Sequence, residues 1–304
     1  MPDAVPAMVE YVWHSKEANF SDEALMAHTE RWAQIVDEAG WDLNFASVIT
    51  PQFADDNFDF MWVMIWPTLE ARDAAWQSWG ETYEAEWLST SEGIFNYDGS
   101  NAFGWTPNPM REPSVENTSA TALTGYMFCE YNAGKGPNDL MSAGEQFNAW
   151  VDSYEEANGP GSYWWAIMTP QFELPEGTNV DYAWFNSWAD ESERAAGNAA
   201  FAESGLAGTF AEIATCQDEA MFDSRAIVAA SGPDRSSDRR TGGQSTRVPM
   251  GRQELKYPNL SLDEYENTYN NLGNLLSMRK NYNTALFTIV SETQYTETYG
   301  VITE

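Results

Sequence analysis

The sequence predicts an α+β fold made of two tandem copies of a β-α-β-β-α-β unit. The first observation is a doubled stretch, because residues 49–66 read ITPQFADDNFDFMWVMIW and residues 168–188 read MTPQFELPEGTNVDYAWFNSW. The second is that hydrophobic periods of two and 3.6 residues follow one another in the same order around each stretch. The third is the composition, since 43% hydrophobic residues and 14 tryptophans are enough for a packed core.

The first copy begins with an alternating, aromatic-rich strand over residues 8–14. Ser21 is a suitable N-cap for a helix that ends at Gly40, because serine accepts hydrogen bonds from the first turn and glycine adopts the left-handed conformation that terminates helices. The remaining predicted elements are strands over residues 43–50 and 58–66, a helix from Thr68 and an irregular strand over residues 93–105.

The second copy repeats this order of elements. Its predicted elements are strands over residues 124–132, 162–169, 180–188 and 218–229, with helices over residues 138–158 and 191–215. The residues that recur at consistent offsets are Trp32 and Trp150, Trp62 and Trp184, Trp66 and Trp188, and Arg72 and Arg194. So many matches in one order indicate an internal duplication.

Composition divides the chain into five predicted segments. They are a first repeat over residues 1–105, a linker over 106–121, a second repeat over 122–230, a basic flexible linker over 231–258, and an appendage of one helix and two short strands over 259–304. The appendage matches neither repeat.

Charge is distributed unevenly. Residues 1–224 hold all but nine of the 47 acidic residues and only six basic ones, whereas residues 225–304 hold nine of each. The acidic part would repel phosphate backbones and anionic lipid headgroups, which argues against binding to nucleic acids or membranes. No transmembrane run or signal peptide is visible. Because cysteine is sparse, we expect Cys129 and Cys216 to be reduced thiols of a cytoplasmic protein; since both fall in the second repeat, a bridge between them is the open alternative.

The order of elements in each copy is that of the ferredoxin-like motif. Written twice, with aromatic-rich strands, it resembles the dimeric α+β barrel superfamily in its tandem-repeat form. That superfamily includes antibiotic-biosynthesis monooxygenases, chlorite-dismutase-like haem proteins and stress-responsive barrel proteins. The resemblance covers about residues 8–229 and implies that the two sheets pair to close a pseudo-dimeric barrel. It implies no single reaction.

One face of each sheet is expected to meet helices and the other to line the barrel. Alternate residues of the third strand point to opposite faces of the sheet. We assign the face with bulky side chains to the barrel interior and the face with smaller aliphatic side chains to the helices. The bulky set comprises Phe60, Trp62, Met64 and Trp66, matched by Tyr182, Trp184, Asn186 and Trp188. On the first strand, the face with polar side chains comprises Glu10, Val12 and His14, matched by Phe128, Glu130 and Asn132. Together these sets predict an aromatic-walled barrel cavity with a few polar groups, as is common at small-molecule sites.

Within that cavity Glu10, Glu130 and His14 are the candidate catalytic residues, because a carboxylate in an apolar cavity can act as a general base. His14 could also be a haem or metal ligand, or an ordinary strand-end residue. The substrate-binding candidates are Trp62, Trp66, Trp184, Trp188, Asn132 and Asn186. His28, the other histidine, is expected to face solvent, and the second helices lack a histidine for haem. We therefore expect no metal and no cofactor.

Two hypotheses follow, and the sequence leaves open whether the protein is an enzyme. In the first, the barrel binds a small hydrophobic or aromatic molecule, with a cofactor-free oxygenase or isomerase reaction as the candidate chemistry. In the second, the barrel is filled by its own side chains, and residues 231–304 form a docking module for self-association or another partner. A hollow interior favours the first hypothesis and a filled interior the second.

Overall fold

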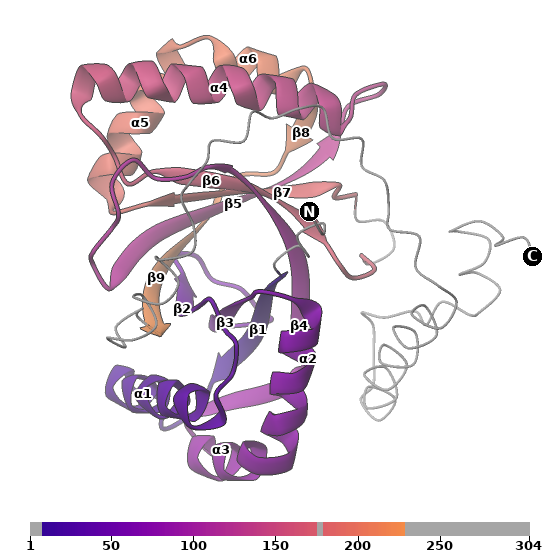
Figure 1. The fold of residues 1–304 in the computed structure, drawn as a ribbon, viewed down its shortest axis with the longest axis vertical. Coiled ribbons are helices and arrows are strands. Elements are labelled where there is room, and N and C mark those ends of the chain that lie inside the picture. The colour runs from indigo at the N-terminus through magenta and orange to yellow at the C-terminus, as the bar shows by residue number, and fades with distance from the viewer. Residues whose placement is uncertain (1–7, 175–178, 229–304) are drawn as a thin grey trace, which may run out of the picture. The chain divides into compact units, whose positions relative to one another are not determined.

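Antiparallel strands close into a barrel in a computed structural model that describes residues 8–174 and 179–228 (Figure 1). We call residues 8–111 the first half and residues 121–228 the second half. The linker predicted over 231–258 and the appendage predicted over 259–304 lie outside the described residues.

The first half follows the predicted order of elements, with its second helical region interrupted by a π-helical segment. Its elements are β1 (Met8–Lys16), α1 (Asp22–Ala39), β2 (Phe45–Pro51), β3 (Phe60–Trp66), α2 (Leu69–Ser78), η1 (Trp79–Tyr83), α3 (Glu84–Ser91) and β4 (Phe95–Arg111). As predicted, the Ser21 side chain accepts a hydrogen bond from the Ala24 amide at the start of α1. Gly40 ends this helix in the left-handed conformation, with a φ of 64°.

The second half differs from its predicted order in one place. Its elements are β5 (Thr121–Tyr131), α4 (Pro137–Asn158), β6 (Trp164–Pro170), β7 (Tyr182–Trp188), α5 (Glu191–Glu203), α6 (Leu206–Ala211), β8 (Ala214–Cys216) and β9 (Ala220–Val228). The single helix predicted over residues 191–215 is wrong, because Gly205 adopts a φ of 78° and separates α5 from α6. Residues 214–216 then pair with β5 as a short strand.

Strand β4 extends six residues beyond the predicted end at residue 105, to Arg111, into the segment predicted as a linker. Pro107 and Pro109 are nevertheless accommodated in it. The pairing of β4 with β1 ends at Trp105, so beyond that point only β6 pairs with β4. A proline is tolerated where one side of the strand has no neighbour, because it supplies no backbone N–H.

Eight strands form the closed ring. The first half contributes the order β4-β1-β3-β2 and the second half the order β9-β5-β7-β6. β2 pairs with β9 and β4 pairs with β6, which joins the halves along both edges. The α+β barrel predicted from the sequence is confirmed by this pairing.

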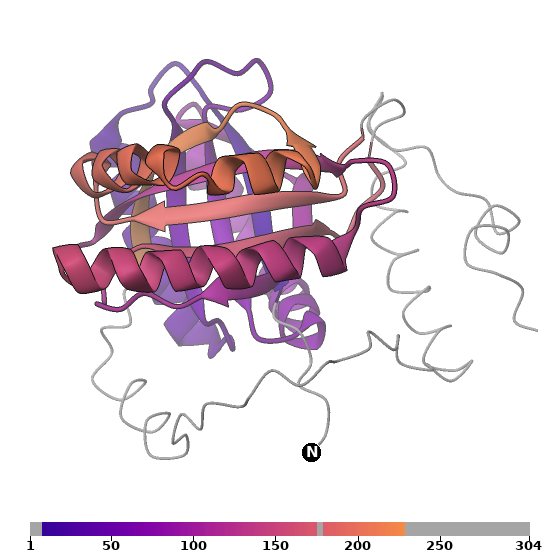
Figure 2. The same cartoon turned by 90° about the horizontal axis from the view of Figure 1, so that it is seen from above.

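Helices cover the outer face of the barrel on opposite sides. α1, α2 and α3 lie over the strands of the first half, and α4, α5 and α6 lie over those of the second (Figure 1). Figure 2 looks onto the helices of the second half, where α4 in magenta lies on one side and α5 and α6 in orange on the other, with a strand of the sheet visible between them. Within the described ranges no helix has both the length and the hydrophobicity needed to span a membrane.

The barrel interior is filled by residues from both halves. Its buried members include Val9, Tyr11, Ile49, Met61, Val63, Trp105, Tyr126, Met168, Phe185 and Phe222. At its centre the hydroxyl of Tyr11 donates to that of Tyr126 over 3.2 Å. Burial raises the pKa of both phenols, so they stay neutral. The aromatic-walled cavity expected inside the barrel is therefore wrong, because side chains from all eight strands, among them Trp105 and Phe185, fill the interior.

The face assignment of the third strand is also wrong. Trp62 and Trp66 belong to the core beneath α1, α2 and α3, whereas Met61 and Val63 line the barrel. In the second half Trp184 packs under the helices and Phe185 lines the barrel. Rings occupy both faces of the sheet, since Trp62 lies under the helices and Trp105 lies inside the barrel, so the size of a side chain does not decide which face it takes.

The two cysteines form a disulfide between β5 and β8, Cys129–Cys216. The expectation of reduced thiols is therefore wrong. Sparse cysteine was a weak indicator, because the fold brings together two residues 87 positions apart in adjacent strands. The predicted cytoplasmic location stays a prediction and loses its support from the cysteines.

Candidate functional site

The predicted site residues do not meet in one cavity. Glu10, His14, Trp62 and Trp66 lie between the sheet and the helices of the first half. Trp184, Trp188 and Asn186 occupy the corresponding space of the second half, among the residues around its cavity. Glu130 is exposed, and the Asn132 side chain bonds to the Ala211 carbonyl and the Thr215 hydroxyl near the end of β5. The predicted grouping of these residues inside the barrel is wrong.

Glu10 is a fully buried partner of an ion pair. Its Oε1 accepts from Arg72 Nε at 2.9 Å and Nη2 at 2.5 Å, and its Oε2 accepts from the indoles of Trp66 and Trp76 at 3.1 and 2.8 Å. Four donors thus surround a carboxylate with no exposed surface. This arrangement fixes Glu10 and Arg72 as a structural ion pair, and the role predicted for Glu10 as a free general base has no support.

His14 is buried among aromatic rings. Its Nδ1 lies 3.0 Å from the Val12 carbonyl, and its ring stacks on Phe60 with a centroid separation of 4.9 Å. Burial lowers the pKa of His14 to about 4, against a smaller opposing effect of the hydrogen bond to Val12. His14 is therefore neutral at neutral pH. His28, predicted to face solvent, is also buried and lies beside Trp87, with Nδ1 2.8 Å from the Ala24 carbonyl.

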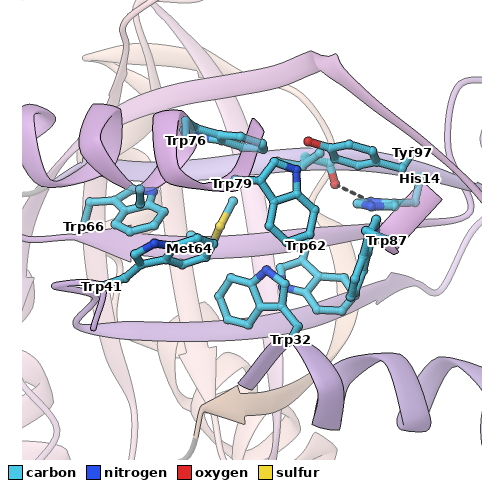
Figure 3. A pocket seen from close by; sticks show the side chains of 12 residues that line it. His14, Trp32, Trp41, Trp62, Met64, Trp66, Trp76, Trp79, Trp87 and Tyr97 are labelled. Carbon is cyan, nitrogen blue, oxygen red and sulfur yellow. Dashed lines mark hydrogen bonds between the residues drawn. The ribbon is translucent and has the colours of Figure 1, made fainter. Parts of the chain in front are cut away.

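The space between sheet and helices in the first half is nearly closed. A cavity of about 30 Å³ remains there, enough for one or two water molecules. Figure 3 shows the labelled indoles of this first-half cavity close to one another, with His14 and Tyr97 together at one end of the group. Trp41, Trp76 and Trp79 come from the end of α1 and from the α2–η1 region, and they close the space from the helix side.

The second half contains a much larger cavity in the corresponding place. This second-half cavity has a volume of about 630 Å³, within the range of small-molecule pockets. Its walls come from β5, β7 and β8 on one side and from α4, α5 and α6 on the other. Nine aromatic side chains line it, so a ligand would meet ring faces over most of its surface.

Strand register and helix caps show why one space is filled and the other open. Thr68 caps α2 and Asp190 caps α5, so Trp76 and Trp79 correspond to Asn198 and Phe201. In the same way Gly40 and Gly159 end α1 and α4, so Trp41 corresponds to Pro160. Pro160, Asn198 and Phe201 all line the second-half cavity. Neither α5 nor α6 has a buried residue.

A polar network lies on the sheet side of the second-half cavity. Asn186 Oδ1 accepts from the Tyr163 hydroxyl and the Trp184 indole, both at 2.9 Å, and Asn186 Nδ2 donates to Glu219 Oε1 at 2.9 Å. The second oxygen of Glu219 accepts from Arg194 Nη2 at 3.1 Å. Burial, followed by the nearby negative charge of Glu219, raises the pKa of Tyr163 well above its ordinary value, so this phenol is a neutral donor.

Gly125 allows Glu219 to take this position. A Cβ atom at Gly125 would lie 2.5 Å from Glu219 Oε1, closer than side chains approach one another. The register explains the arrangement, since Gly125 faces Asn186 as Glu10 faces Met64. The first half thus carries its carboxylate on the central strand, whereas the second half supplies it from the start of β9.

Sequence reasoning missed Tyr163 and Glu219, because neither stands in a recognisable motif. The available signal was the loss of bulk at Asn198 and Pro160, which becomes visible only once the two copies are aligned through their helix caps. The described part of the chain contains no cluster of three or more histidine, cysteine, aspartate or glutamate side chains suited to a metal ion.

Comparison with known proteins gives similarity to solved structures only. No family model matches the chain. No curated protein sequence matches it either. Among solved structures, a proposed monooxygenase from Fusobacterium nucleatum is 13% identical, with a TM-score of 0.45 over 74% of this chain and 94% of that one.

Two further solved structures are similar at the same level. A mutant chlorite dismutase from Candidatus Nitrospira defluvii is 7% identical, with a TM-score of 0.43 over 73% of this chain and 92% of that one. A heme-binding protein from Thermus thermophilus is 11% identical, with a TM-score of 0.41 over 73% of this chain and 91% of that one. These scores lie below 0.5 and support no argument about this chain, whose fold rests on its own strand pairing.

Proposed function

We propose that this protein binds a small hydrophobic or aromatic molecule in the second-half cavity. The single observation that carries the proposal is the difference between two related spaces, one of about 30 Å³ and the other of about 630 Å³. Close packing is the normal state of protein interiors, and a large apolar void loses contacts without a ligand to restore them. Binding would supply those contacts.

We also propose that the two halves are tandem ferredoxin-like repeats of a pseudo-dimeric barrel. The strand orders β4-β1-β3-β2 and β9-β5-β7-β6 support this, because the corresponding strands occupy the same places in each order. The site proposed here then belongs to one repeat only, and the other repeat serves as its packed counterpart. The predicted segment boundaries remain part of this proposal.

A cofactor-free oxygenase or isomerase reaction would require a proton acceptor at the cavity. The predicted bases Glu10, Glu130 and His14 are not among its lining residues. Glu219 is the carboxylate on the sheet side, but it already accepts from Asn186 and Arg194. Binding is therefore the function that the geometry supports best, and Glu219 is the group to test for a catalytic role.

The cavity does not fit a histidine-ligated haem. The chain has two histidines, and both His14 and His28 lie in the first half. The arginines beside the cavity, Arg111 and Arg194, are each bound to two carboxylates and are not free to bind haem propionates. The expectation that no cofactor is needed stays a prediction.

Neighbouring alanines of α5 provide a matched test. Both Ala195 and Ala196 are exposed, but only Ala196 is among the residues that line the second-half cavity. With the neutral fluorophore N-phenyl-1-naphthylamine, we expect saturable 1:1 fluorescence enhancement and a raised Tm in the unaltered protein. Ala196→Trp should abolish both effects and Ala195→Trp should leave them unchanged. The proposal fails if no member of a panel of neutral and charged aromatic compounds binds, or if both variants behave alike.

The filled barrel favours a second candidate, a non-enzymatic interaction protein. In this case residues 231–304, which are basic near their start, would dock on a partner such as the acidic barrel of another copy. The expected results are a mass above that of the monomer at low salt and loss of this association after removal of residues 231–304. If light scattering finds the same number of chains in the assembly before and after truncation, the docking role is contradicted.

A further inference from the structure

We infer that the ligand of the second-half cavity carries a positive charge, as an aromatic or alkyl ammonium group does. This inference rests on the proposed binding function and adds the chemical class of the ligand. It is carried by the aromatic walls, by the charges around the cavity, and by the pairing of the nearby basic residues.

The aromatic walls suit a cation. A positive charge is attracted to the face of an aromatic ring, most strongly to tryptophan, and the attraction grows when water is excluded. Trp150, Trp184 and Trp188 are among the nine rings that line the cavity. Arg194 already lies over the ring of Trp188 with a distance of 5.8 Å to the centroid, so one of these rings holds a cation within the protein itself.

The charged side chains around the cavity have a negative balance. Glu155, Glu193 and Glu219 line it, and no lysine or arginine is among its lining residues. Glu155 shares Arg111 with Asp152. Glu219 shares Arg194 with Glu191. Four carboxylates therefore share two guanidinium groups, and Glu193 adds a fifth carboxylate.

Glu193 contributes a negative charge that no basic side chain offsets within the described ranges. Its Oε1 accepts from the Ser162 and Tyr163 amides, and its Oε2 accepts from the Ser162 hydroxyl and the Ala189 amide. These donors keep the carboxylate in place beside the cavity but do not neutralise it. An ammonium ligand would reduce the repulsion among the carboxylates, whereas a carboxylate or phosphate ligand would increase it.

The acidic composition of residues 1–224 strengthens the preference for a cationic ligand. Residues 1–224 hold all but nine of the 47 acidic residues and only six basic ones. A field of this sign raises the local concentration of cations and lowers that of anions, and the effect weakens as salt is added. The charge preference should therefore depend on ionic strength, and the purely apolar part of the affinity should not.

Three ligands of similar shape and different charge provide the test. They are 1-methylquinolinium as the cation, 1-methylnaphthalene as the neutral compound and 1-naphthoate as the anion. Affinities for the full chain are measured by quenching of tryptophan fluorescence and by the shift in Tm. At low salt we expect the cation to bind at least about tenfold more tightly than the anion, with the neutral compound between them. In 0.5 M NaCl the gap between cation and anion should narrow.

A carboxylate variant and its control locate the effect. Glu219→Gln should weaken binding of the cation several-fold and leave the neutral compound nearly unchanged. Glu130→Gln alters an exposed carboxylate outside the lining and should change neither. The salt series uses the unaltered protein, so the inference stays testable if Glu219→Gln fails to fold.

The possible failures are distinguishable. If the neutral compound binds as tightly as the cation at every salt concentration, the charge inference is overturned and the binding function stands. Tightest binding of the anion would also overturn the inference. If none of the three compounds nor the neutral fluorophore binds, the proposed function itself fails.

Discussion

The two spaces between sheet and helices differ although similar elements enclose them. In the first half, Trp41, Trp76 and Trp79 close the space from the helix side. In the second half the corresponding positions hold Pro160, Asn198 and Phe201, and a cavity remains. The comparison teaches that the size of a few side chains on the helices and just after their caps is sufficient to close this space in one half and leave it open in the other.

The central strands carry the same contrast. His14 faces Tyr97 across β1 and β4, and the corresponding residues of the second half, Cys129 and Cys216, form the disulfide. Two rings that help to fill the first half are thus replaced by a compact covalent link. The second half gains space and keeps its edge strand tied to the sheet, which suggests that the disulfide compensates for the packing that an open cavity lacks.

The ion pairs give the largest expected difference between the halves. Glu10→Gln leaves Arg72 buried without its main counter-charge, so we expect a loss of about 3–5 kcal/mol in the free energy of unfolding. Glu219→Gln affects a pair that is 17% and 23% exposed, and we expect about 1 kcal/mol. Urea denaturation followed by circular dichroism measures both values. Equal losses would show that the first-half pair is not the more buried one in solution.

The disulfide gives the next largest effect. Reduction of Cys129–Cys216 frees a loop closed over 87 positions, and we expect it to lower the free energy of unfolding by about 2–4 kcal/mol. The measurement compares denaturation with and without dithiothreitol. The double variant Cys129→Ala/Cys216→Ala is the control, because reductant should leave its stability unchanged. Detection of two free thiols in the oxidised, unfolded protein would contradict the assignment.

The sequence predicted the barrel but not the orientation of its strands. The repeat is strong enough to define the order of elements, and caps such as Ser21 and Gly40 are local signals that do not depend on the rest of the fold. The offset between the copies is not constant, however. Tyr11 corresponds to Tyr126, an offset of 115, because they face Val63 and Phe185 in the same register.

The change in offset occurs inside the first helix of each copy. α1 has 18 residues and α4 has 22, a difference of about one turn. Matching Trp32 to Trp150 therefore shifts the first strand by three residues, and an odd shift moves side chains to the other face of a sheet. For this reason the sequence match groups Glu130 and Asn132 with His14, although they lie elsewhere in the structure. The cavity could not be predicted, because it depends on side chains that are small rather than on a motif.

The buried imidazole of His14, a residue of the first half, predicts that the free energy of unfolding depends on pH. The pKa of His14 is about 4 in the folded protein and about 6.5 when unfolded, so the unfolded state binds the proton more readily. The contribution of neutral His14 to the free energy of unfolding is fully present above about pH 6.5 and is lost as the pH falls towards 4. Between pH 7.5 and 5 this loss is about 2 kcal/mol. His14→Phe should show a correspondingly smaller loss in urea denaturation, and parallel pH profiles of the two proteins would contradict the assignment.

The smallest expected effect concerns Gly125, which in the second half occupies the position that Glu10 has in the first half. In Gly125→Ala the new Cβ would collide with Glu219, whose carboxylate must leave Asn186, so we expect a loss of about 1 kcal/mol in the free energy of unfolding. In a Glu219→Ala background the same change should cost nothing, because the colliding group is absent. Gly208→Ala, at a helix position with open space around it, is the control and should be neutral or slightly stabilising. A double-mutant cycle measures the coupling. If Gly125→Ala costs the same in both backgrounds, the close approach of Glu219 does not explain why the second half has glycine where the first half has Glu10.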